Sequence, residues 1–227
     1  MADRRHIVRS YSRELDLLRR SLVLMAGRVE VMIGQAVRSV MEGDISLAHQ
    51  VIEEDKAVNR DELDIDAQCM QMIARWQPVA GDLRFITRTL KMVTDVERIG
   101  DLAVSICDRS VSLSVLSASP ISPGIAQMGR QVQAMVHQVI DAFVEQDAAQ
   151  ARDVIALDDD VDELYHHLCR QQLQQMDGDP RVLERGILIQ AIARHLERIG
   201  DHCTNIAEQV IYMVEGCDVR HPNSRLQ

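Results

Sequence analysis

The 227-residue sequence is poor in residues that interrupt helices and poor in aromatic side chains. Glycine occurs 11 times and proline five times, so helices can run for many turns without a break. Phe, Trp and Tyr together make up 3% of the chain, which is too few for the stacking platforms that bind single-stranded nucleic acids. So few aromatic residues are also unlike an all-β sandwich. These scarcities favour an all-α protein.

Cysteine and long apolar runs are scarce as well. The five cysteines are scattered and form no C-x-x-C pair, which is typical of reduced thiols in a cytosolic protein. The N-terminus passes directly into charged sequence without the apolar core of a signal peptide. The longest segment without charge, residues 110–129, is rich in Ser, Pro and Gly and indicates a linker flanked by helix ends. We therefore expect a cytoplasmic protein with no membrane span of its own.

The charge balance is acidic. Lys and Arg number 25 against 35 Asp and Glu, which gives a formal net charge of −10. General nucleic-acid binding depends on Lys and Arg that neutralise phosphates, so this balance argues against it.

The chain repeats itself. The pentapeptide Glu-Arg-Ile-Gly-Asp occurs at residues 97–101 and again at 197–201. Upstream, at a shift of 103 residues, further identities align the two halves, so the chain consists of two copies of a unit of about 100 residues. The upstream pairs include Met25 and Met128, Val29 and Val132, Met32 and Met135, Asp44 and Asp147, Ala48 and Ala151, Val51 and Val154, Asp55 and Asp158, and Val58 and Val161.

Each copy is predicted to form three helices. Pro78 and Pro180 occupy corresponding places near helix ends, and Pro120 and Pro123 separate the copies. The expected helices span 10–42, 44–76, 82–116, 124–146, 148–176 and 181–216. We thus expect an all-α fold of two tandem homologous three-helix bundles, residues 10–117 and 124–216.

Acidic residues interrupt the apolar seam of the second helix in each copy. Asp55 and Asp158 fall among apolar residues that recur every three or four positions, and Asn59 and Asp162 follow one turn later. A carboxylate on a buried seam must be paired, protonated or coordinated to a cation, because an unpaired buried charge is costly.

The repeated pentapeptide places another acid pair in each copy. Glu97 and Asp101, like Glu197 and Asp201, are spaced i, i+4 at the margin of the apolar stripe, where the two charges repel each other. Together with the acids of the neighbouring helix they would form an oxygen-rich site in each bundle. Such a site suits Mg²⁺, Mn²⁺, Fe or Zn²⁺.

Both the acids and the glycines of the pentapeptide have an alternative explanation. Arg98 and Arg198 could instead pair with acids of adjacent helices in a solvated network. Gly100 and Gly200 each cost about 1 kcal/mol relative to alanine within a helix, which suggests close approach of a neighbouring helix or an ion. Simple tolerance of a weak helix former is the other explanation.

No catalytic motif is present. The sequence lacks a Gly-rich phosphate loop, G-x-S-x-G and H-E-x-x-H. Glu163 and His166 match one Glu-x-x-His half of a di-iron carboxylate centre, but no second half exists, so we expect a surface pair. His202, next to the second pentapeptide, is a candidate for an additional ligand.

Taken together, these motifs resemble the PhoU family over nearly the whole chain. The resemblance rests on Asp-Leu-Arg at 82–84 after Gln-Pro at 77–78, on Asp-Val-Glu-Arg-Ile-Gly-Asp at 95–101, on Leu-Glu-Arg-Ile-Gly-Asp-His at 196–202 with Asn-Ile at 205–206, and on the ending 214–221.

The resemblance implies a cytoplasmic homodimer that lies at the inner membrane through its partners. These partners are the ATP-binding subunit of the phosphate ABC transporter and the phosphate-sensing histidine kinase. Family members restrain phosphate uptake and keep the phosphate-starvation (Pho) regulon off when phosphate is plentiful. The expected function is therefore that of a non-enzymatic signalling adaptor and negative regulator.

The resemblance also implies metal ligands, because some family members hold metal clusters on E(D)-x-x-x-D motifs. Asn59 replaces the second acid of one motif, so the first site carries one charge fewer than the second. A di-metal carboxylate enzyme or a metal store is the alternative function. The implied ligands are Asp55, Asn59, Glu97 and Asp101 in the first copy, and Asp158, Asp162, Glu197 and Asp201 in the second.

Overall fold

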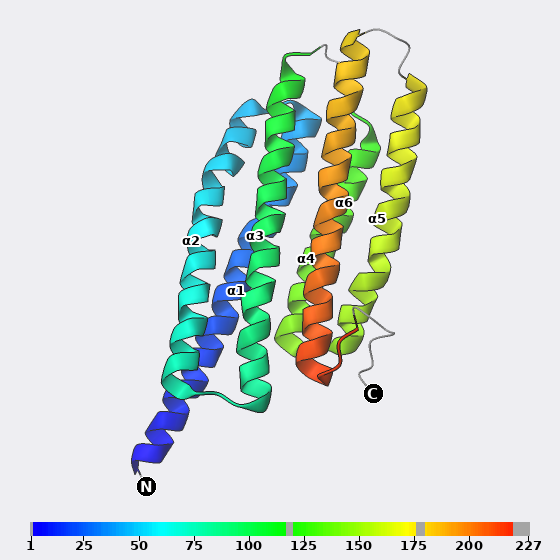
Figure 1. The fold of residues 1–227 in the computed structure, drawn as a ribbon. Helices are drawn as coiled ribbons and strands as arrows, with labels where there is room; N and C mark the ends of the chain where they lie inside the picture. The colour runs from blue at the N-terminus through cyan, green and yellow to red at the C-terminus, as the bar shows by residue number, and fades with distance from the viewer. Residues whose placement is uncertain (1, 117–119, 176–179, 220–227) are drawn as a thin grey trace.

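The chain folds into long helices joined by short connections (Figure 1). The structure is a computed structural model that describes residues 2–116, 120–175 and 180–219, with the backbone alone for 2–8 and 175. No strand occurs in these ranges, which confirms the all-α prediction. The helices are α1 (Ala2–Glu42), α2 (Ile45–Trp76), α3 (Ala80–Ser114), α4 (Pro123–Glu145), α5 (Ala148–Gln175) and α6 (Pro180–Glu215).

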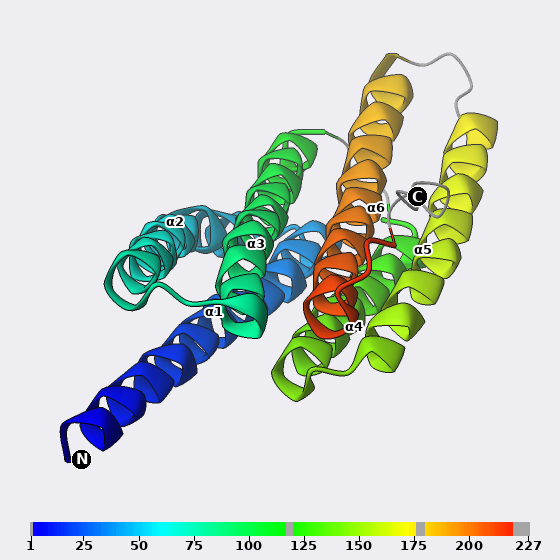
Figure 2. The same ribbon diagram turned by 60° about the horizontal axis from the view of Figure 1, so that its bottom comes forward.

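The helices form two three-helix bundles that share one core. α1, α2 and α3 pack together, as do α4, α5 and α6, and the bundles meet where α3 lies against α6 and α1 against α4 (Figures 1 and 2). A single apolar cluster runs through both bundles. The repeat-related pairs Met25 and Met128, Val29 and Val132, and Val58 and Val161 are all fully buried, so the repeat seen in the sequence marks the core.

The connections repeat as well. The side chain of Asp44 accepts a hydrogen bond from the Leu47 amide at 3.0 Å and caps α2. Asp147, its counterpart, accepts from the amides of Ala149 and Gln150 in the first turn of α5. An acceptor at this position satisfies amides that have no partner inside the helix. These caps explain why Asp44 and Asp147 recur in the two copies.

The first helix is longer than predicted. α1 begins at Ala2, not at residue 10, and its N-terminal part projects past the other helices (Figure 2). The prediction was wrong here because it relied on the apolar period, whereas residues 2–9 contain no glycine or proline to end a helix. The remaining helix bounds lie within two residues of those predicted. Residue 176, the predicted end of the fifth helix, and residue 117, the predicted end of the first unit, fall outside the described residues.

None of the described helices combines the length and the apolar composition that a bilayer span requires.

Candidate functional site

The predicted ligands come from two adjacent helices in each bundle. α2 and α3 carry the first set and α5 and α6 the second, and each of these helix pairs packs side by side. The apolar residues on both sides of each acid are buried in the core, so the acids are held at the helix–helix boundary. The tertiary structure therefore places the acids of each predicted set close enough to repel one another, but not around a single point.

The glycines of the pentapeptides face the acids of the neighbouring helix. A Cβ atom at Gly200 would overlap the Oδ1 atom of Asp158, so this carboxylate lies directly against the α6 backbone and would have to turn if a side chain were added. At Gly100 a Cβ atom would lie 3.5 Å from Asp55 Oδ1 and 3.4 Å from Val58 Cγ1, which are ordinary contacts. Close approach thus explains Gly200, while alanine would fit at Gly100.

Repulsion and burial act together on the first cluster. Asn59 Nδ2 donates a hydrogen bond of 2.9 Å to Asp55 Oδ2, which favours the charged form of Asp55. Burial outweighs this bond and raises the pKa of Asp55, and the nearby Asp101 raises it further. Burial and Asp101 likewise raise the pKa of Glu97. The surrounding protein therefore does not supply enough positive charge or hydrogen bonds to stabilise the carboxylates of this cluster in their charged form.

Glu62 belongs to the first cluster, although it was not among the predicted ligands. Burial raises the pKa of Glu62 above its usual range, with contributions from Asp66 and Asp101, and Glu62 in turn raises the pKa of Glu97. A signal for it was present, because Glu62 lies seven residues after Asp55 and thus on the same helix face. Its counterpart in the second copy is Tyr165, so the two clusters differ here.

The second cluster is the more strongly perturbed. Burial, followed by the charges of Asp162, Asp201 and Glu197, raises the pKa of Asp158 to about 7. Between its ordinary pKa of 3.8 and about 7, the folded protein binds a proton that the unfolded chain has released. Without a bound cation, stability therefore decreases as the pH rises through this window. A cation at this site would remove that penalty.

An arginine partly compensates the second cluster. Arg194 Nη1 donates to Glu197 Oε1 at 2.6 Å, and its guanidinium lies 5.7 Å from the centre of the Tyr165 ring. Burial and Asp201 nevertheless keep the pKa of Glu197 raised. In the first cluster, Arg98 Nε lies 3.6 Å from Glu97 Oε2 on the same helix, and the charge of Arg98 also acts on Glu62 of α2.

His202, the candidate for an additional ligand, pairs with an acid outside the four-residue sets. His202 Nδ1 lies 2.9 Å from Asp95 Oδ1, so this side chain joins α6 to α3 of the other bundle. Glu163 and His166 are exposed on α5, as expected for a surface pair, and line a hollow of about 720 Å³ together with His167.

Several carboxylate oxygens of the clusters are buried without a hydrogen-bond partner. They are Asp55 Oδ1, Asp158 Oδ1 and Glu197 Oε2. Buried oxygens of this kind normally have a partner, so they fit a site that accepts a cation. In the arrangement seen across the described residues, however, no three His, Cys, Asp or Glu side chains converge on one point as metal ligands.

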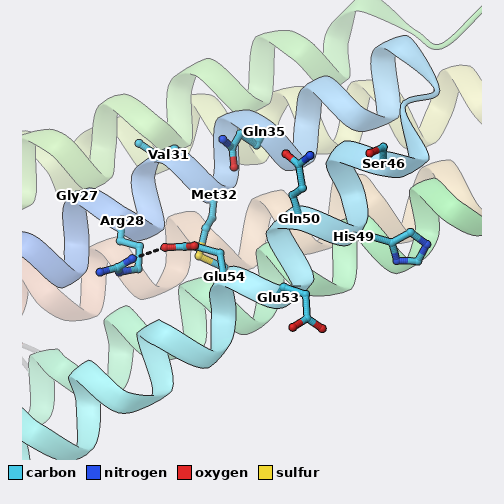
Figure 3. Close-up of a pocket in the computed structure, with 10 residues that line it drawn as sticks. All are labelled: Gly27, Arg28, Val31, Met32, Gln35, Ser46, His49, Gln50, Glu53 and Glu54. Carbon is cyan, nitrogen blue, oxygen red and sulfur yellow. Dashed lines mark hydrogen bonds and ion pairs between the residues drawn. The ribbon is translucent and has the colours of Figure 1, made fainter.

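Another hollow lies away from the acidic clusters, between α1 and the first half of α2. It has a volume of about 960 Å³, and none of the eight predicted ligands lines it. Figure 3 shows Gly27, Val31 and Gln35 along one edge and Gln50 and Glu54 along the other. Arg28 of α1 pairs with Glu54 of α2 across this hollow.

Comparison with known sequences places both repeats in one family. The PhoU domain model matches residues 22–110 and 125–210. The "Phosphate-specific transport system accessory protein PhoU homolog" of Pseudomonas aeruginosa is 42% identical over 95% of this chain and 90% of its own length. The "Phosphate-specific transport system accessory protein PhoU" of Escherichia coli is 36% identical over 96% of this chain and 90% of its own length.

Solved structures agree with the sequence comparison. The crystal structure of PhoU from Pseudomonas aeruginosa matches with a TM-score of 0.87 and 41% identity, over 91% of this chain and 100% of that one. The phosphate transport system regulatory protein PhoU from Streptococcus pneumoniae matches with a TM-score of 0.86 and 25% identity, over 92% and 99%. The repeated helical units, the duplicated pentapeptide and these similarities lead to one conclusion: the chain belongs to the PhoU family.

Proposed function

We propose that this protein is an accessory regulator of a phosphate-specific transport system. It restrains phosphate uptake and keeps the Pho regulon off when phosphate is plentiful. As a cytoplasmic homodimer at the inner membrane, it acts as an adaptor between the ATP-binding subunit of the phosphate ABC transporter and the phosphate-sensing histidine kinase. The observation that carries this proposal is the 42% identity to a phosphate transport accessory protein over 95% of the chain.

The architecture supports an adaptor, not an enzyme. An adaptor transmits a coupling free energy between two binding sites, so its two halves must not move independently. One continuous core joins the bundles, and the α3–α6 and α1–α4 contacts connect them along their length. The state of one partner can therefore bias the protein toward an arrangement that the other partner recognises.

Deletion of the gene tests this function. We expect the deletion strain to express phosphate-starvation genes in phosphate-rich medium, because the kinase loses the partner that reports a saturated transporter. A reporter fused to a starvation promoter measures the effect, and a plasmid copy of the gene should restore repression. Pull-downs of the kinase and the transporter ATPase then identify the partners. Normal repression in the deletion strain would contradict the proposed role.

We further propose that the acidic clusters bind a hard cation such as Mn²⁺, Fe, Zn²⁺ or Mg²⁺. The donor chemistry fits, because every predicted ligand offers oxygen and several buried oxygens have no partner. Asp158, Asp162, Glu197 and Asp201 would hold the ion in the second bundle, after side-chain movements that bring them together. The bound ion would supply positive charge that relieves their mutual repulsion. Asp55, Asn59, Glu97 and Asp101 would form the weaker site in the first bundle.

Elemental analysis of the purified protein tests the metal proposal. Protein prepared without chelators is expected to contain metal, and the Glu197→Ala/Asp201→Ala variant is expected to lose the ion of the second bundle. Asp141→Ala/Glu145→Ala is a matched control, because it removes an acid pair of the same i, i+4 spacing from α4, outside both clusters. Equal metal content in all three proteins, or none in the wild type, would overturn the proposal.

A further inference from the structure

The boundary between α3 and α6 joins the two bundles, and polar pairs span it at one end. The two helices lie side by side and run in opposite directions (Figure 1). Arg88 Nη1 of α3 donates to Gln209 Oε1 of α6 at 3.0 Å. Two turns further along α3, Asp95 Oδ1 lies 2.9 Å from His202 Nδ1. A step of seven residues forward along α3 therefore corresponds to a step of seven residues back along α6.

At the next step of this register, the histidine of α6 has no acid to meet. Leu102 of α3 comes opposite His195 of α6, two turns beyond the pair of Asp95 and His202. Leu102 is buried and its side chain offers no hydrogen bond. Both ring nitrogens of His195 are buried, and neither has a hydrogen-bond partner among the described residues. Buried polar atoms normally have one, so His195 lacks what His202 finds in Asp95.

Positive charge surrounds His195, although the protein as a whole is acidic. Burial lowers the pKa of His195, and the charges of Arg109 on α3 and Arg198 on α6 lower it further. Both arginines are exposed, and neither has a hydrogen bond or an ion pair within the part of the chain that the structure describes. The acids next to them in the sequence are Asp108 and Glu197, and neither of these is among the charges that act on His195. Arg198 does act on Glu197, so part of its charge serves the second cluster.

We propose that Arg109, His195 and Arg198 form a binding site for a phosphate-type oxyanion at the α3–α6 boundary. The planar fork of an arginine matches the oxygens of a phosphate group, and an imidazole ring carries at least one N–H in either protonation state. Because the ring nitrogens are covered, the two exposed arginine side chains would turn to admit the anion. The anion would then stand beside His195 as the Asp95 carboxylate stands beside His202.

An anion at this site would contact both bundles. Arg109 belongs to the first bundle and His195 to the second, so an anion held by both favours the arrangement in which α3 and α6 lie together. A ligand that binds one arrangement better than another shifts the population toward it. This regulatory consequence rests on the proposed function, whereas the binding itself does not.

Calorimetric titration of the full chain with inorganic phosphate tests the site. The protein is first treated with a chelator, so that phosphate cannot bind through a metal ion at the acidic clusters. The wild type is expected to bind phosphate, and Arg109→Gln to bind it at least about tenfold more weakly, because a charge-assisted hydrogen bond is lost. Arg130→Gln is the matched control, since Arg130 is exposed on α4 and should not affect the affinity. Circular dichroism verifies that both variants keep their helices.

A second variant and a spectroscopic measurement test whether the anion lies at the imidazole ring. His195→Leu should also weaken phosphate binding about tenfold. In NMR spectra, phosphate should shift the ring nitrogen resonances of His195 more than those of His137, an exposed histidine on α4.

Titration with AMP distinguishes the free ion from a phosphate ester. Tighter binding of inorganic phosphate identifies the free ion and tighter binding of AMP an ester, and either result supports the site. No binding of either compound up to about 10 mM, or equal phosphate affinity in the wild type and Arg109→Gln, would overturn the inference. Because these measurements use the purified protein, such a failure would not touch the regulatory role, which the deletion strain tests separately.

Discussion

Replacement of Phe143 by alanine is expected to lower the free energy of unfolding by about 3–5 kcal/mol, the range seen when a buried aromatic residue is truncated. Phe143 on α4 is fully buried. Its ring stacks on Phe85 of α3, with ring centroids 5.6 Å apart and an interplanar angle of 14°. The loss combines the transfer of the ring out of the core, the cavity left behind and the lost aromatic contact.

The position of Phe143 makes this substitution informative about the whole molecule. Phe85 belongs to the first bundle and Phe143 to the second, so their contact lies in the part of the core that both bundles share. Arg19 of α1 also lies over the Phe85 ring, 5.4 Å from its centroid. We therefore expect both bundles to unfold in one cooperative transition, and the Phe143→Ala variant to unfold in one transition at lower denaturant.

Urea titrations followed by circular dichroism measure this effect. Leu63→Ala serves as the control, because Leu63 is largely exposed and its truncation should change stability by less than about 0.5 kcal/mol. A loss below about 1 kcal/mol for Phe143→Ala, or two separate transitions in the wild type, would show that the bundles do not share the core described above.

The Gly129→Ala substitution is expected to destabilise the protein by about 1–3 kcal/mol, the usual range for overpacking a close-packed core. Gly129 is buried on α4 where this helix crosses α1. An added Cβ atom would lie 2.7 Å from Val37 Cγ2 and 3.0 Å from Val37 Cγ1. A β-branched side chain in a helix has one strongly preferred rotamer, so Val37 cannot turn away and the helices must separate.

A double-mutant cycle identifies the source of this loss. Val37→Ala removes the two methyl groups that the new Cβ would meet, so Gly129→Ala should cost much less in that background. Gly81→Ala is the matched control, because Gly81 lies in the first turn of α3 with open space at its Cβ position. It should leave stability unchanged or raise it by up to about 1 kcal/mol. Equal effects of Gly129→Ala and Gly81→Ala would contradict the proposed steric cause.

Much of the candidate site could be predicted from the sequence because it is built from local periodicity and duplication. Residues four positions apart in a helix share a face, so the sequence alone places Glu197 and Asp201 side by side. The same pair recurs at residues 97 and 101, which distinguishes it from acid pairs expected by chance in an acidic sequence. The tertiary structure added Glu62 to the first cluster and Arg194 to the second. Both depend on which helix face meets which neighbour, and the spacing within one helix does not determine that.

The all-α fold, the six helices and most of their bounds, though not the start of α1, followed from the sequence alone, through the scarcity of glycine, proline and aromatic residues, the apolar period and the repeat. These are properties of segments of about 30 residues, governed by backbone propensity and amphipathic pattern. Only the tertiary structure decided how the bundles join. The contact of α3 with α6 and the stacking of Phe143 on Phe85 depend on packing between residues far apart in the chain. That packing is decided by how side-chain shapes fit together across the helices.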